Sequence, residues 1–296
     1  MSGIVEIKSR IESIREMQKI TNAMYLIACA KLEHAKAGLN ATRPYFDALS
    51  REIKRVFRIE GNIENKYFYP ASGEYEIEGA YGYLVITADK GLAGVYNQNV
   101  IKKVLALMKA HDESKLFVVG EYGRQYFESH HIPIEKSFIY TAQNPTLNRA
   151  RKISSILLDM YDKGELKKIF VVYTDFGGGM NTEVKTFRLL PFHRKDFRTG
   201  DVAEKEHFEF LHSLNKVLDN IMPSYTTGYI YSALIDSFCS EQSSRMNAMN
   251  TANENTKELL SDLKLRYNRQ RQEIITREIT EIAAASKNQS SGEAGK

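Results

Sequence analysis

Long helical stripes occupy both ends of the chain. From Ile4 to Leu39, mostly apolar and small residues recur at steps of three and four positions without a break. That spacing is typical of the seam of a left-handed coiled coil. A similar stepping runs from Ile235 to Tyr267, inside a segment from 225 to 285 that contains no proline and one glycine. The stripes predict long N- and C-terminal helices that pair as an antiparallel coiled coil and project from a globular middle.

Between the stripes, strand and helix patterns alternate. Strands are expected at 79–89, 115–120 and 167–176, with a weak one at 136–141 and an antiparallel neighbour of the third at 182–192. Helices are expected at 94–111, 121–130 and 145–164. Strands that alternate with helices predict a Rossmann-like α/β globular domain with a largely parallel sheet.

Glycine and proline predict where the terminal helices end. Gly38 and Pro44 predict that the first helix stops near Leu39 and that a separate helix covers 45–59. Pro223 predicts a kink or the true start of the last helix.

These signals divide the chain into four parts. Residues 1–60 hold the N-terminal coiled-coil helix and the helix after it, and 61–205 form the α/β domain. Residues 206–285 hold the C-terminal coiled-coil helix. The small, polar residues at 286–296 predict a disordered tail.

Composition excludes several classes of protein. The 296 residues carry 41 basic and 37 acidic side chains, a net charge of +4 that is too small to indicate nucleic-acid binding. No apolar run is long enough for a membrane-spanning helix, and the N-terminus resembles neither a secretory signal nor a transit peptide. Two cysteines, Cys29 and Cys239, fit a reducing compartment, so we expect a cytoplasmic, and bacterial, protein.

The seam is polar or small in its middle, with Gln18 and Thr21 on the first stripe and Gln242, Asn253 and Thr256 on the second. Polar seam residues can fix the register of a coiled coil at some cost in stability. The functional interpretation is that the rod must not adhere strongly to its surroundings, as a shaft turning inside a collar requires.

Catalytic motifs are absent from the sequence, which contains no phosphate loop, GxGxxG, HExxH, GxSxG or CxxC. Gly91 to Gly94 could bind an anion before a helix, but more often such glycines only allow a tight turn. Asp89 and Asp175 fall at strand ends, where carboxylates cap turns more often than they catalyse. His130 and His131 fit a loop better than a metal site. We therefore expect no catalytic residue, cofactor or metal.

Three segments resemble the gamma subunit of the F-type ATP synthase. Residues 7–39, IKSRIESIREMQKITNAMYLIACAKLEHAKAGL, match the family's N-terminal helix. Residues 86–97, ITADKGLAGVYN, resemble its ITSDRGLCGGYN-like segment, with Ala93 and Val95 in place of Cys and Gly. Residues 240–282 follow its SEQ…RM…YN…RQ…IT pattern, and the resemblance covers nearly the full chain.

The resemblance implies a non-catalytic rotary part. In that family the paired terminal helices form the central stalk inside a ring of three alpha and three beta subunits. The globular foot sits with the epsilon subunit on the membrane rotor ring, the c-ring. Ion flow turns the stalk, which drives the beta sites through different nucleotide affinities. The implied location is the cytoplasmic face of a bacterial cell membrane, reached only through the complex.

The resemblance also implies contact residues, carried over where the motifs align. They are Met24 in KITNAM, Arg245 in SEQSSRM, and Arg271 and Gln272 in YNRQRQ. In the family these regions approach one another and the moving loops of the beta subunits. Arg271 and Gln272 can form charge-assisted hydrogen bonds to a beta carboxylate.

If Met24 lies level with Arg245, paired residue numbers add to about 269. That register predicts that Cys29 and Cys239 face each other near the base of the rod, as small packing residues.

Two other functions fit parts of the sequence. A nucleotide- or phosphate-binding α/β enzyme with coiled-coil arms would show saturable ligand binding by its middle domain. A coiled-coil scaffold would form a concentration-dependent dimer. The missing motifs argue against the first and the polar seam against the second, so the rotor hypothesis is favoured.

Overall fold

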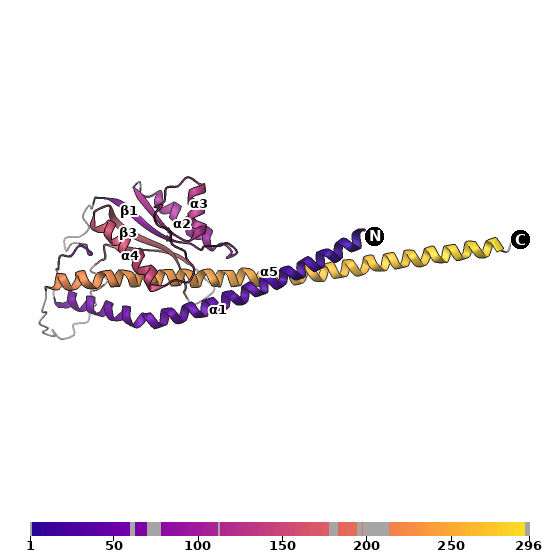
Figure 1. Cartoon of the computed structure of the whole chain (residues 1–296), viewed down its shortest axis with the longest axis horizontal. Coiled ribbons are helices and arrows are strands. Elements are labelled where there is room, and N and C mark those ends of the chain that lie inside the picture. The colour runs from indigo at the N-terminus through magenta and orange to yellow at the C-terminus, as the bar shows by residue number, and fades with distance from the viewer. Residues whose placement is uncertain are drawn as a thin grey trace. The chain divides into compact units, whose positions relative to one another are not determined.

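A computed structural model describes residues 2–59, 63–69, 78–111, 113–177, 183–193, 197 and 213–293. The chain divides into two compact units. One comprises Met1–Ile27 with Asn247–Lys296, and the other is Ala28–Met246. We call them the helical unit and the α/β unit and describe each by itself (Figure 1).

The first helix, α1, runs unbroken over Ser2–Ile59 and includes Pro44. The expected end near Leu39 is therefore wrong. A proline inside a helix removes one hydrogen bond and costs about 3 kcal/mol. Apolar side chains after Pro44 offset that cost, because Ile53, Val56 and Phe57 are buried in the core.

The last helix, α5, spans Leu214–Glu293 and includes Pro223. It begins before Pro223, and the Thr227 hydroxyl donates to the Pro223 carbonyl at 2.8 Å. It continues past residue 285, where composition predicted a disordered tail. Residues 206–212 of the predicted helix and 294–296 of the predicted tail lie outside the described residues.

The α/β unit contains a four-stranded sheet in the order β2-β1-β3-β4. Its strands are β1 (Ala80–Ile86), β2 (Ser114–Val119), β3 (Leu166–Asp175) and β4 (Glu183–Leu190). The first three strands are parallel and β4 is antiparallel to β3, which confirms the predicted pairing. The weak strand expected at 136–141 is reduced to one bridge between Tyr140 and Val119.

Helices cover both faces of this sheet, as Figure 1 shows for the α/β unit. Helices α2 (Tyr96–Met108) and α3 (Glu121–Ser129) pack on the face that presents Val85 and Val118. Helix α4 (Leu147–Asp162) and the α1 and α5 segments of this unit pack on the face that presents Leu84 and Phe117. Strands buried on both faces explain the continuous apolar runs in the sequence.

In the helical unit, α1 and α5 pair antiparallel along a narrow seam. Ile11 and Ile14 are buried with Leu260 and Leu263, and Ile7 and Tyr267 pack against them. The Thr21 hydroxyl donates to the Asn253 side-chain oxygen, a contact that fixes the register. Residues at one level have numbers that add to about 274, so the level of Met24 falls near residue 250.

The α1 and α5 segments of the α/β unit share that register. The ring of Phe46 lies directly over Gly228, and the Thr42 and Tyr231 hydroxyls are hydrogen-bonded. Cys239 is therefore level with residue 35, and the charges of Glu33 and Lys36 act on the pKa of its thiol. The predicted pairing of Cys29 with Cys239 is wrong by roughly one and a half helical turns. Both thiols are free, and burial raises the pKa of Cys239 to about 11.

Candidate functional site

The surface of the helical unit carries two of the predicted contact residues. Arg271 and Gln272 are exposed on consecutive positions of α5. Nearby, Arg269 and Glu273 form an exposed ion pair at 3.5 Å, whereas Arg271 has no ion pair among the described residues. The guanidinium of Arg271 is therefore available to an acidic partner.

Met24 lies elsewhere on the same unit. Its side chain is half-buried on α1. In the observed register its level is roughly twenty residues, or about 30 Å, from Arg271 along α5. Within the helical unit the structure therefore does not bring Met24 together with Arg271 and Gln272.

Exposed apolar side chains accompany these residues. On α1, Ile20 is 61% exposed, and Leu26 and Ile27 are similarly open. On α5, Ile279 and Ile282 are exposed beyond Arg271. Large apolar side chains that are more than half exposed are unusual enough to suggest a surface that another protein covers, where several lie near one another, as Leu26 does with Ile27 and Ile279 with Ile282. The rod therefore carries exposed apolar side chains at outward positions, although the middle of its seam is polar or small.

Arg245 belongs to the α/β unit and is not a free surface arginine. Its side chain is 12% exposed and pairs with Glu241 at 2.6 Å, one helical turn before it. The other guanidinium nitrogen donates to the Gly91 carbonyl at 3.2 Å. Burial raises the pKa of the Glu241 carboxyl, and the charge of Arg245 opposes that rise. Arg245 thus fixes the loop after β1 to α5.

That loop presents two apolar side chains to solvent. Leu92, at a positive φ of 63°, and Val95 are each about two-thirds exposed, while Ala93 is buried beneath them. The loop is thus a fixed apolar projection. The less favoured interpretation of Gly91 to Gly94 as an anion site gains no support from the Arg245 contact, since the guanidinium is already paired with Glu241.

Asp89 at the end of β1 has a structural role. Its carboxylate accepts hydrogen bonds from the backbone N–H groups of Glu121, Ala142 and Gln143 at 3.0–3.1 Å. Asp175 at the end of β3 pairs with Lys185 on β4. Both strand-end carboxylates are therefore engaged within the fold. Asp89 caps backbone N–H groups, as the capping interpretation expects, whereas Asp175 forms an ion pair instead.

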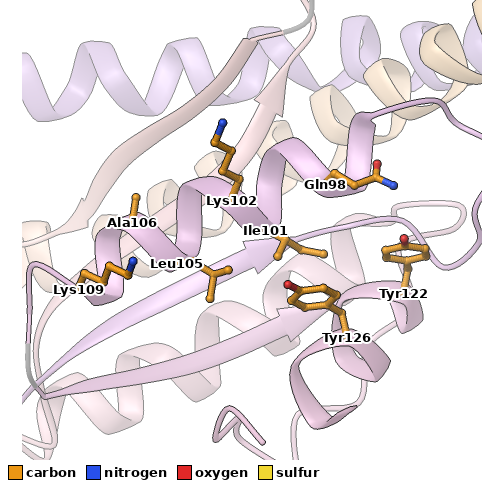
Figure 2. Close-up of a pocket in the computed structure, with 8 residues that line it drawn as sticks. All are labelled: Gln98, Ile101, Lys102, Leu105, Ala106, Lys109, Tyr122 and Tyr126. Carbon is orange, nitrogen blue, oxygen red and sulfur yellow. The ribbon is translucent and has the colours of Figure 1, made fainter. Parts of the chain in front are cut away.

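A hollow of about 440 Å³ lies between α2 and α3. Figure 2 shows Tyr122 and Tyr126 of α3 facing Ile101 and Leu105 of α2, while Lys102 points away from the rings. The hollow has an apolar floor and contains no carboxylate, histidine or cysteine. Its titratable groups, among the described residues, are the amines of Lys102 and Lys109 and the hydroxyls of Tyr122 and Tyr126.

Other functional features are limited in the same way. Among the described residues, no three histidine, cysteine or acidic side chains are grouped so that they could hold a metal ion. No helix in the described part of the chain is both long and apolar enough to cross a bilayer.

Sequence reasoning missed two carboxylates of the α/β unit. Glu241 could have been found, because Glu and Arg four residues apart on a helix can pair. Asp236 is mostly buried and lies near Asp175, and burial with that like charge raises its pKa to about 6. Its neighbourhood assembles from β3, β4, α1 and α5, so no local pattern marks it.

Comparison with known proteins identifies the family of this chain. A family model described as "ATP synthase" matches residues 3–287. The chain belongs to this ATP synthase family.

Its curated relatives are gamma chains. An "ATP synthase gamma chain" from Caldanaerobacter subterraneus is 39% identical over 290 residues, covering 95% of this chain and 98% of the relative. Another from Ruminiclostridium cellulolyticum is 38% identical over 283 residues, covering 94% and 95%. These relatives are similar along their whole length.

Solved structures agree in fold. A chain of the Euglena gracilis mitochondrial ATP synthase, from the assembly of OSCP, F1 and c-ring, has a TM-score of 0.67 at 14% identity. That likeness covers 99% of this chain and 96% of the other. A chain from the central stalk and c-ring of the Tetrahymena thermophila enzyme has a TM-score of 0.60 at 23% identity, covering 79% and 99%.

Proposed function

We propose that this chain is the rotating central stalk of an F-type ATP synthase. The helical unit turns inside a ring of three alpha and three beta subunits, and the α/β unit is the foot that joins it to an epsilon subunit and the c-ring. Ion flow through the c-ring drives the rotation during synthesis, and ATP hydrolysis reverses it. The chain is non-catalytic and binds no cofactor, and it reaches the cytoplasmic face of a bacterial membrane through the complex.

The observation that supports this proposal is the outward surface of the helical unit. Apolar side chains are open to water both on the paired helices, as at Ile20, and on the part of α5 beyond the seam, as at Ile279. A partner that encloses the helices would cover them. Each orientation of such a shaft makes different contacts with the surrounding subunits, which is the condition for shifting a binding equilibrium.

Four residues have proposed contact roles. Arg271 and Gln272 donate hydrogen bonds to beta carboxylates, and Met24 packs against the surrounding ring at a different level. Arg245 contributes indirectly, because its contact with Gly91 holds the exposed loop that carries Leu92.

The proposal is tested by assembly with the matching alpha and beta subunits. We expect one copy of the chain in a complex with three of each partner, and ATPase activity that depends on the chain. Arg271→Ala and Gln272→Ala should each lower turnover several-fold, the effect of removing one charge-assisted contact.

Arg266→Ala is the matched control, since Arg266 is another exposed arginine of the same helix. It should leave turnover within twofold of the wild type. A chain that dimerises alone and ignores alpha and beta would reject the stalk in favour of a scaffold. Saturable nucleotide binding by the chain without those subunits would favour the enzyme hypothesis.

A further inference from the structure

Two cavities of the α/β unit meet at Asp236 on α5. One, of about 440 Å³, lies between α1 and α5 and includes Arg43, Asp47 and Phe176 in its lining. The other, of about 400 Å³, opens beside β3 and β4 and includes Tyr173 and Phe187. Tyr229, Ser232 and Asp236 line both. A carboxylate therefore lies at the junction of two solvent-open cavities.

Aromatic rings form much of the walls around this carboxylate. The first cavity is lined by the rings of Phe46, Phe176, Tyr225, Tyr229 and Tyr231. In the second, the rings of Phe187 and Tyr229 have centroids 5.5 Å apart. The faces of such rings attract cations, and Lys36 already lies 5.2 Å from the centroid of Phe176.

Two cations of β4 near the site have other close partners. Lys185 on β4 pairs with Asp175. Arg188 on β4 lies 4.6 Å from the ring of Tyr69 and donates to its hydroxyl at 3.1 Å. No lysine or arginine of the described segments lies within ion-pairing distance of Asp236, whose hydrogen-bond partner is Ser232.

We propose that the Asp236 junction is a binding site for an organic cation, a guanidinium or alkylammonium group. The cation would sit against the Tyr229 ring and donate to the Asp236 carboxylate, combining a cation–π contact with a charge-assisted hydrogen bond. The natural source of that group is either a free organic cation or a lysine or arginine side chain of a partner protein. This site is independent of the rotor function proposed above.

The carboxylate of Asp236 has no close ion-pair partner among the described residues. The more distant charges of Lys185 and Arg43 favour its ionised form, Asp175 opposes it, and Arg188 also lines the second cavity. Burial and Asp175 raise the pKa of Asp236 to about 6, so the group is ionised at pH 7.5 and mostly neutral at pH 5. Burial raises the pKa of Tyr173 and Tyr231, so these two lining tyrosines stay neutral across that range.

The test is calorimetric titration of the full chain with arginine amide at pH 7.5. Citrulline amide, which replaces the guanidinium by a neutral urea of similar shape, is the control ligand. We expect saturable binding of arginine amide only. Asp236→Asn should weaken it by roughly tenfold or more, and lowering the pH to 5 should have a similar effect.

Asp262→Asn is the control variant, because Asp262 is an exposed aspartate of the same helix. It should leave binding unchanged. Tyr229→Leu keeps an apolar wall but removes the aromatic face, and it should weaken binding by a few-fold. Equal binding of both amides, unchanged binding by Asp236→Asn, or no saturable binding by the wild type would overturn the proposal.

The same titration on the chain assembled with its partner subunits separates the two sources. Loss of arginine amide binding on assembly would identify a partner's side chain as the occupant. Retained binding would identify a free cation.

Discussion

The two units of this chain bury their apolar residues in very different ways. The sheet of the α/β unit is covered on both faces, so that Leu84, Phe117 and Val171 have no exposed surface. The helical unit buries only a single seam, and its inner residues Leu260 and Leu263 keep some exposure. This difference indicates that the α/β unit is stable through its own core, whereas the helical unit leaves apolar surface for other proteins to cover.

The largest expected effect contrasts the two interiors directly. Leu84→Ala removes a fully buried side chain from the sheet and should lower the free energy of unfolding of the α/β unit by about 2–5 kcal/mol. Leu260→Ala should cost only about 1–2 kcal/mol, because a seam one layer thick can close over the gap. Native-state hydrogen exchange measures both.

Exchange should rise in the strand amides for Leu84→Ala and in the amides of residues 2–27 and 247–283 for Leu260→Ala. If Leu260→Ala raised exchange throughout the strands, the two units would unfold cooperatively as one, and they would not have separate stabilities.

A smaller effect concerns the pH dependence of the α/β unit. The pKa of Asp236 is raised to about 6 in the folded chain, against about 3.9 when unfolded. Between these two pKa values the folded chain keeps a proton that the unfolded chain has lost. The free energy of unfolding therefore falls as the pH rises from about 4 to about 6, and it stays at the lower value above pH 6. The loss is about 1–3 kcal/mol.

Asp236→Asn should remove this loss. The free energy of unfolding of the variant, minus that of the wild type, should grow between pH 4.5 and 7.5 in urea titrations. If the difference between variant and wild type stayed constant across that pH range, the pKa of Asp236 would not be raised in the folded chain.

The smallest effect is expected on the surface of the helical unit. Arg269→Ala breaks the exposed ion pair with Glu273 and should change stability by no more than about 0.5 kcal/mol. A thermal melt of the isolated chain checks this. A loss above 2 kcal/mol would mean that this surface is structured by more than the helix seam.

Local patterns predicted much of the fold. The stepping of apolar residues indicated the seam around Ile11 and Leu263, and alternation indicated the sheet and the antiparallel β4. Tertiary packing decided the rest. Burial of Ile53 and Phe57 carries α1 through Pro44, against the local stop signal.

The candidate sites were less predictable, because they depend on register and on distant residues. An antiparallel pair can shift by one turn without disturbing either stripe, and contacts such as Thr21 with Asn253 select the alignment. Arg245 donates to the Gly91 carbonyl from a position far along the sequence, so no local pattern of residues predicts that contact.

Rotation of this chain within the alpha–beta ring can be observed directly. The most direct measurement fixes that ring to a surface and attaches a bead to the α/β unit through Lys103→Cys, an exposed position on α2. Cys29→Ser removes the competing accessible thiol, while Cys239 is buried and its raised pKa keeps it unreactive.

On addition of ATP, we expect the bead to rotate in one direction, with three pauses per turn for the three beta sites. ATP hydrolysis with no net direction of bead movement would contradict this expectation.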